Sequence, residues 1–161
     1  MIAPVRGPGV PARALNGLMA LVVGRLGLPF PRAWMLRVHG RRTGRLHSVP
    51  VLVLHRRGAR YLVAPRGQTD WARNLRAAGW GELWRGDRRE RVAADELAGE
   101  ERAEIVGAYA RRYGWLTGRF FDLPRRFGPD DVRGIADRHP TFRLRPNGAL
   151  RATRQNLPPR G

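Results

Sequence analysis

The pattern of apolar and polar positions predicts a series of short β-strands through the middle of the chain. Runs rich in β-branched and aromatic residues are separated by turns that contain glycine or adjacent arginines. Three strands with such short connections make an antiparallel meander, and two more short strands follow later, joined by a tight turn at Gly86-Asp87. The expected strands cover residues 34–38, 48–55, 60–64, 81–84, 90–94 and 141–145.

Apolar residues at helical spacing predict three helices around these strands. Residues 12–26 form an amphipathic stretch bracketed by arginines, which fits either a helix packed on the core or a basic helix on a membrane surface. A short helix over 71–78 is expected to be capped by Asp70 and ended by Gly79. A longer helix over 97–113 has acids in its first turns and arginines in its last, which suits the helix dipole.

These elements predict one α+β domain over residues 1–161. Many short antiparallel strands are most economically arranged by curling into a small barrel, because a barrel leaves few open edges. The Pro/Gly-rich start and the Pro-rich end are expected to be loose, and residues 114–139 show no clear period. The expected divisions are a loose segment 1–10, the helix 12–26, a barrel core with helices over 34–145, and a loose tail 155–161.

Composition narrows the chemistry. The chain has no cysteine, no lysine and a single serine, Ser48, so thiolate, Schiff-base and P-loop lysine chemistry are excluded. Its four histidines show no metal-ligand spacing. A net charge of +18, carried entirely by arginine, attracts polyanions such as nucleic acid, acidic lipids or phosphates. An enzyme of this composition would depend on a bound cofactor, and the absence of a long apolar run or a secretory signal favours the cytoplasm.

Two segments could bind an anion. The turn Gly40-Arg41-Arg42-Thr43-Gly44-Arg45-Leu46-His47-Ser48-Val49-Pro50 joins three arginines to hydrogen-bonding side chains, and its glycines let backbone N–H groups face a ligand. The alternative is a solvated hairpin loop. The second segment, Ala64 to Leu75, ends a strand, passes through Gly67 and opens a helix that carries Trp71 and Asn74 on one face. Trp71 could equally be a core residue.

Together these segments resemble a known family. The pattern G-R-[RK]-[ST]-G-x-x-x-x-x-P, a middle strand and then W-x-x-N-L-R-A are similar to the deazaflavin-dependent nitroreductases and quinone reductases of actinobacteria, here at Gly40–Pro50 and Trp71–Ala77. The acidic helix opening at 97–103 is also similar. The resemblance covers residues 34–112 and implies a split β-barrel of the FMN-binding type that binds coenzyme F420, a hydride carrier with a phosphate and an oligoglutamate tail.

The resemblance also implies which positions meet the cofactor. Arg41, Arg42 and Thr43 would hold the phosphate and acidic tail. The path towards the ring would be lined by Arg45, His47, Ser48, Val49 and Pro50. The ring itself would be bordered by Ala64, Pro65 and Gly67 and closed off by Trp71 and Asn74. The family commonly has lysine at position 42, arginine at position 47 and a longer Ser/Lys/Gly-rich loop near 65–68, so FMN or haem-like ligands remain alternatives to F420.

The resemblance thus implies hydride transfer from reduced F420 to a small hydrophobic acceptor: a quinone, nitroaromatic or conjugated alkene. Tyr109, Tyr113 and His47 are the candidate proton donors, although the two tyrosines would fit core packing as well. The other functional classes are a non-catalytic barrel that binds a cofactor or lipid, and a basic nucleic-acid-binding module. No specific nucleic-acid motif is present, and the chain is expected to be a monomer or homodimer with possible membrane contact only through residues 12–26.

Overall fold

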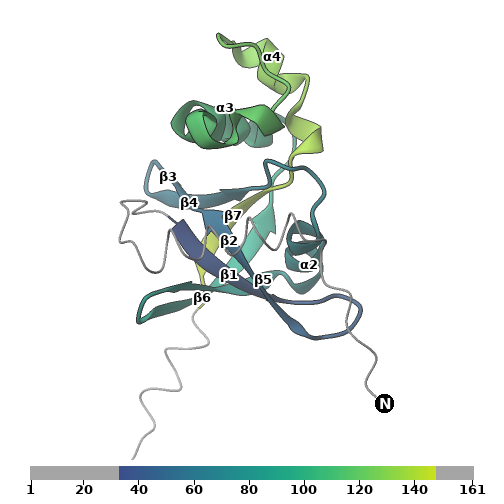
Figure 1. Cartoon of the computed structure of the whole chain (residues 1–161), viewed down its shortest axis with the longest axis vertical. Coiled ribbons are helices and arrows are strands. Elements are labelled where there is room, and N and C mark those ends of the chain that lie inside the picture. Colours follow the sequence, from purple (N-terminus) through teal and green to yellow (C-terminus); the bar gives the residue numbers. More distant parts are fainter. Residues whose placement is uncertain (1–32, 148–161) are drawn as a thin grey trace, which may run out of the picture.

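Seven antiparallel strands form one sheet in the computed structural model, which describes residues 33–147. The segments 1–10, 12–26 and 155–161 lie outside the described residues. The sheet order is β2-β1-β5-β6-β7-β4-β3, and Figure 1 shows the sheet curled into a half-open barrel. The strands are β1 (Ala33–His39), β2 (Leu46–Leu52), β3 (Leu54–Arg56), β4 (Ala59–Val63), β5 (Trp80–Arg85), β6 (Arg88–Glu96) and β7 (Thr141–Pro146).

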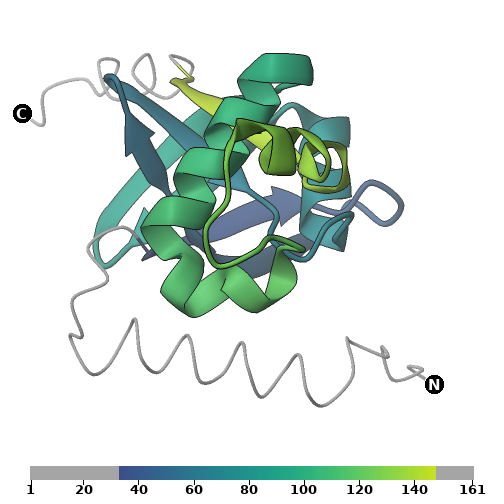
Figure 2. The ribbon, with the colours of Figure 1, turned by 90° about the horizontal axis from the view of Figure 1, so that it is seen from above.

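Helices cover the barrel at two places. The helix α2 (Asp70–Ala78) lies beside the turn that joins β1 to β2, and it contacts β1, β5 and β6. The long helix α3 (Gly99–Thr117) and the short helix α4 (Pro129–Arg133) cover the opposite side of the sheet, as Figure 2 shows from above. Two single 3₁₀ turns, Gly118–Phe120 and Ala136–Arg138, complete this cover. The architecture confirms the predicted α+β split barrel.

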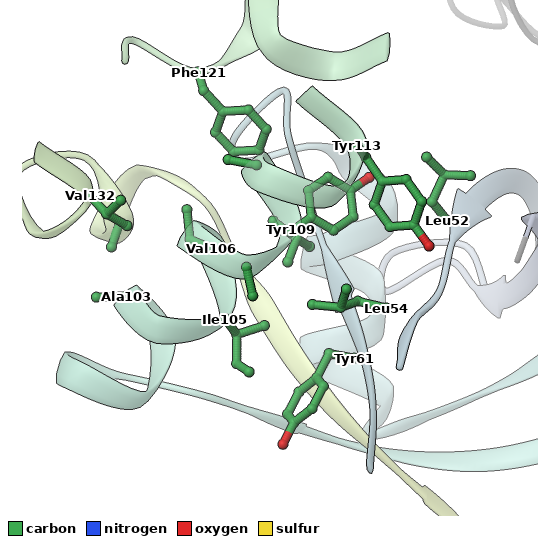
Figure 3. Packing of buried hydrophobic residues seen from close by; sticks show 14 of the residues in the cluster. Leu52, Leu54, Tyr61, Ala103, Ile105, Val106, Tyr109, Tyr113, Phe121 and Val132 are labelled. Atoms are coloured by element: carbon green, nitrogen blue, oxygen red, sulfur yellow. The ribbon is translucent and has the colours of Figure 1, made fainter. Parts of the chain in front are cut away.

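Two apolar clusters hold these layers together. One fills the barrel between the sheet and α2, and its fully buried members include Leu36, Leu75 and Phe142. The other lies between α3 and the strands β3 and β4, where the rings of Tyr109 and Tyr113 meet edge to face at 5.0 Å (Figure 3). Edge-to-face contacts add to the stabilisation from buried apolar area. The α3 cluster therefore fixes the helical cover on the barrel.

The structure corrects several sequence expectations. The predicted strand over 48–55 is two strands, because the chain leaves its pairing with β1 after Leu52 and begins to pair with β4 at Leu54. The N-cap of α2 is Thr69 rather than Asp70, and it makes no side-chain capping bond. The third helix runs over Gly99–Thr117 rather than 97–113. Apolar periodicity does not reveal which partner a strand pairs with, so it could not show the break at Val53.

A side chain from α3 is hydrogen-bonded to the backbone at the break. Val53 lies outside both strand ladders, and its buried carbonyl accepts a hydrogen bond of 3.1 Å from the hydroxyl of Tyr113. We predict that Tyr113→Phe lowers the free energy of unfolding by about 1 to 2 kcal/mol, because it removes the partner of a buried acceptor. Urea denaturation followed by circular dichroism measures this loss.

Tyr61→Phe provides the matched control. Tyr61 lies in the same cluster and is 8% exposed, but its hydroxyl makes no hydrogen bond within residues 33–147. Its removal should change the free energy of unfolding by less than about 0.5 kcal/mol. Equal losses in the two variants would show that the Tyr113 hydroxyl has no special part at the break.

Candidate functional site

The turn between β1 and β2, which we call the arginine turn (residues 40–45), is closed by its own backbone. Gly40 donates its N–H to Arg45 at 2.8 Å, and Gly44 donates its N–H to Gly40 at 2.9 Å. Gly44 has φ +67°, a left-handed conformation that glycine adopts without strain. A Cβ at Gly40 would lie 2.9 Å from Nε2 of His47. The shape of the turn therefore favours glycine at position 44, whereas a side chain at position 40 would require that of the exposed His47 to move.

The arginine turn is docked onto α2 through one residue. Arg41 donates its backbone N–H (3.1 Å) and its Nη1 (2.8 Å) to the same oxygen, Oδ1 of Asn74. Its guanidinium also lies 3.4 Å from the carboxylate of Asp70. Asn74 is only 4% exposed, whereas the Asp70 side chain is 83% exposed. The two sequence motifs thus meet through a buried amide, and Arg41 is largely engaged within the protein.

The remaining cations of this region have no acidic partner within residues 33–147. The guanidinium groups of Arg42, Arg45 and Arg73 are exposed and make no ion pair there. Thr43 contributes its hydroxyl oxygen to the backbone N–H of Arg45 at 3.3 Å. Exposed guanidinium groups without an acidic partner in the described part of the chain are suited to bind phosphate or carboxylate.

The strand β2 leads from the arginine turn along an edge of the sheet. His47 and Ser48 are exposed, whereas Val49 and Pro50 are half-buried. β2 pairs with β1 from Leu46 opposite His39 onwards, with Ser48 opposite Arg37. The edge strand therefore begins directly after the arginine turn.

The loop between β4 and α2 leads directly into the helix on which the arginine turn is docked. Ala64 is fully buried, and Gly67 takes a left-handed φ of +83°. The hydroxyl of Thr69 is buried and has no hydrogen-bond partner within residues 33–147. Trp71 is half-buried, and its ring lies 6.2 Å from that of Phe142. Trp71 therefore has one face in the core and a part that remains exposed.

A pocket of about 290 Å³, which we call the side pocket, opens next to this loop. Its walls come from the loop and from the segment that follows α3: Pro65, Arg66, Gly67, Phe120, Asp122, Arg138 and His139. Nδ1 of His139 lies 3.1 Å from the carbonyl oxygen of Ala64. Burial is the main cause that lowers the pKa of His139, with a smaller contribution from the charge of Arg138, so its imidazole is neutral at pH 7.

Two candidate proton donors lie away from this region. Tyr109 and Tyr113 are buried in the α3 cluster, and burial raises the pKa of the Tyr109 hydroxyl (Figure 3). The hydroxyl of Tyr113 is already bonded to Val53. Core packing, the alternative interpretation, is what the structure shows for both. His47 is on the exposed edge strand.

Sequence reasoning missed the walls of the side pocket. Phe120, Asp122, Arg138 and His139 come from the stretch over 114–139 that had no readable period, because it is built from short helical turns and irregular chain. In the sequence, Arg138 and His139 lie just before the last predicted strand, but two such residues form no pattern that indicates a pocket.

Comparison with known proteins supplies the family. Residues 13–115 match the model of the F420H(2)-dependent quinone reductase family, which is well over half of the chain. The chain belongs to this family. It is therefore an F420-dependent oxidoreductase, and coenzyme F420 is its cofactor, as the resemblance implied. No curated protein sequence matches the chain.

Solved structures share its fold at low sequence identity. A structure described as a domain-swapped dimer is 18% identical, with a TM-score of 0.52, and the match covers 83% of this chain and 96% of that one. The protein Atu2129 of Agrobacterium tumefaciens, of unknown function, is 19% identical with a TM-score of 0.52, over 91% of this chain and 60% of that one. An F420-H2 dependent reductase (FDR-A) is 20% identical with a TM-score of 0.49, over 71% of this chain and 94% of that one.

The residues present fit an F420-type group on three counts. The arginine turn offers a phosphate and an acidic tail cations that have no acidic partner among the described residues. The buried hydroxyl of Thr69 has no partner within residues 33–147, and it lies at the start of α2, where the first backbone N–H groups have none within the helix. Trp71 is half-buried, so part of its ring is open to a planar group. No described helix is long and apolar enough to cross a membrane.

The docking of the arginine turn gives a stability prediction. Asn74→Ala removes the acceptor of two hydrogen bonds at a buried position, and we expect it to lower the free energy of unfolding by about 2 kcal/mol. Asp70→Ala breaks an exposed ion pair, and it should cost less than about 0.5 kcal/mol. Thermal and urea unfolding of both variants measure the difference. A larger loss in Asp70→Ala would mean that the ion pair, not the amide, holds the turn.

Proposed function

We propose that this protein reduces a small planar acceptor, such as a quinone, nitroaromatic or conjugated alkene, with F420 held between the arginine turn and the β4–α2 loop. The observation that carries the proposal is the pair of hydrogen bonds from Arg41 to Asn74, at 3.1 and 2.8 Å. They place the two family motifs against each other, so that a single ligand can contact both.

The anionic part of the cofactor is assigned to the arginine turn. Arg42 and Arg45 are exposed and have no acidic partner within residues 33–147, so they can turn their donors towards a phosphate or the glutamate tail. Arg41 contributes differently from the role implied by the resemblance. Its guanidinium holds the turn on α2, and it acts mainly as a positioning residue for Arg42 and Thr43.

The ring part is assigned to the loop and the start of α2. Ala64, Pro65 and Gly67 would border the ring, and the exposed part of Trp71 would cover it. The hydroxyl of Thr69 could pair with a polar ring atom, since it has no partner within the described residues. Val49 and Pro50 are half-buried, which suits an apolar wall along the path between turn and ring.

The chemistry needs few protein groups. When bound and reduced, the deazaflavin supplies the hydride at its C5 atom. A quinone that accepts one hydride and one proton becomes a hydroquinone, so the protein has only to orient the acceptor, exclude water and allow a proton to reach its oxygen. His47 on β2 and His139 in the side pocket are the titratable groups that border the proposed site.

The setting of the reaction is also part of the proposal. A cytoplasmic enzyme fits the sequence, and contact with a membrane surface would involve residues 12–26, outside the described part of the chain. A homodimer is the assembly that we favour, since a solved structure with the same fold is described as a domain-swapped dimer. FMN is the alternative cofactor.

The assignment of the anionic tail to the arginine turn can be tested by removing its exposed charges. Arg42→Gln together with Arg45→Gln should weaken F420 binding by about tenfold or more at low salt, and the difference should shrink as salt screens the charges. Fluorescence titration of F420 measures the affinity. The loss should be larger for F420 with a long glutamate tail than for the form without glutamates.

Arg57→Gln is the matched control for this pair. Arg57 is a highly exposed arginine in the turn between β3 and β4, and in the described part of the chain it pairs only with Glu104. Its replacement should leave F420 affinity unchanged. Equal affinity in the double variant would refute the assignment of the turn. No F420 binding at micromolar concentration, with tight binding of single-stranded DNA instead, would favour the nucleic-acid-binding alternative.

The assignment of Trp71 to the ring part of the site can be tested by substitution. Trp71→Ala should weaken F420 binding and also lower stability by about 2 kcal/mol, since half of the ring packs near Phe142. Trp71→Phe should restore most of the affinity and stability. If Trp71→Ala lowers only the melting temperature and F420 affinity stays intact, Trp71 is a core residue.

A further inference from the structure

We propose that the side pocket is the acceptor subsite of this reductase, and that its two arginines favour small planar acceptors with an anionic substituent. This inference rests on the proposed function, because it takes the β4–α2 loop as the border of the cofactor ring. Nothing in the family match assigns this pocket or a charge to the acceptor.

The position of the side pocket is the first argument. Pro65 and Gly67, which the resemblance places at the ring edge, are also walls of the pocket. A molecule in the pocket would therefore lie against the same backbone as the ring. Hydride transfer requires direct contact between acceptor and ring, and this shared wall is a place where such contact can occur.

The pocket is also held in shape without a ligand. Nδ1 of His139 lies 3.1 Å from the carbonyl oxygen of Ala64, and the N–H of Ala64 donates to the carbonyl of Pro140 at 2.9 Å. A Cβ at Gly67 would come within 3.1 Å of the backbone oxygen of Arg138. The loop and the segment before β7 are thus packed directly against each other. A preformed pocket binds with a smaller entropic cost than one that must be ordered.

Size and apolar surface limit the acceptor to a small aromatic. A volume of about 290 Å³ is at the lower end for pockets that bind small molecules, which suits one or two fused rings. Phe120 is the aromatic residue of the lining, and the guanidinium groups of Arg66 and Arg119 lie over its ring at 5.1 and 4.7 Å. Stacking on Phe120 holds Arg66 at the pocket, while its donor edge stays available.

Charge gives the specificity. Arg66 makes no ion pair within residues 33–147, and Arg138 pairs only with Asp122, at 3.6 Å. The side chains of Arg138 and Asp122 are 60% and 87% exposed. Their ion pair is therefore weak and sensitive to salt. Two positive charges thus oppose one negative charge in the lining. His139 adds none at pH 7, since burial lowers its pKa. The lining favours an anionic substituent such as a carboxylate or sulfonate.

The test measures acceptor binding without turnover. Protein loaded with oxidised F420 is titrated in a calorimeter with naphthoquinone sulfonate and with menadione, which have similar ring systems but different charge. We expect the sulfonate to bind about five- to tenfold more tightly at low salt, and this preference to shrink at high salt. Equal affinities at low salt would overturn the charge assignment.

Variants that remove a positive or a negative charge from the lining show whether these side chains cause the preference for the sulfonate. Arg66→Gln and Arg138→Gln should each reduce the preference for the sulfonate about threefold and leave menadione within twofold. Asp122→Asn should increase the preference, because it removes the only negative charge of the lining. Asp122 is highly exposed, so this variant should fold normally. An unchanged or reduced preference in Asp122→Asn would overturn the proposal. Arg126→Gln, an exposed arginine outside the lining, is the control that should have no effect.

Two further measurements separate this inference from the proposed function. F420 affinity should be unchanged in Arg138→Gln and Asp122→Asn, because these two residues lie outside both the arginine turn and the β4–α2 loop. If F420 binds but the pocket variants leave both probes unaffected, the acceptor subsite is wrong while the cofactor site stands. If F420 does not bind and the sulfonate preference persists in cofactor-free protein, the proposed function and the acceptor role both fall.

Discussion

A single buried amide joins the two halves of the proposed cofactor site. Oδ1 of Asn74 accepts two hydrogen bonds from Arg41, which lies 33 residues earlier in the chain. One of these bonds comes from the backbone, so it fixes the path of the arginine turn and not only the direction of a side chain. Because Arg42 and Arg45 lie in the same turn, this link also positions these two cations, which have no acidic partner within residues 33–147. A ligand that binds both the turn and the β4–α2 loop meets a site that is already assembled.

The arginine-only charge of the protein is divided among distinct uses. Some arginines pair with the few acids, as Arg76 does with Glu96 and Arg145 with Asp95. Others stack on aromatic rings of the sheet, where the guanidinium of Arg91 lies 3.6 Å from the ring centre of Trp80. Arg37 and Arg89 both stack on Trp84 at 4.0 Å. Stacking occupies one face of a guanidinium without cancelling its charge. A high net charge is therefore compatible with a few cations that are free for a ligand.

The barrel and the two motifs could be predicted from the sequence, because both are indicated by patterns of residues that are close together in the chain. Alternating apolar residues specify short strands, and Gly44 and Gly79 take the left-handed conformations that end a turn and a helix. The sequence was insufficient where a residue's role depends on a distant partner. It could not show that Arg41 is engaged by Asn74, or that the apolar run over 48–55 divides between two partner strands.

The side pocket is the clearest case of this limit. Its walls combine a loop at 65–67 with residues after α3, and the second group lies in irregular chain with no period to read. Tyr109 and Tyr113 illustrate the converse, since polar aromatic residues in a helix look functional in sequence yet form part of the core. Burial, which separates these cases, is a property of the packed molecule.

The position of β7 has a consequence for how the chain reaches this structure. β7 is last of the seven strands in sequence, yet it lies inside the sheet, paired with β6 on one side and β4 on the other. Until it is in place, β6 and β4 each present an unpaired edge, and no strand connects the half of the sheet that packs on α2 to the half that packs on α3. Such long-range pairing slows folding and leaves edges open to association with other chains. On the ribosome, the barrel cannot close before its final strand has emerged, so the time between synthesis of β4 and of β7 is the interval in which this protein is most exposed to misassembly.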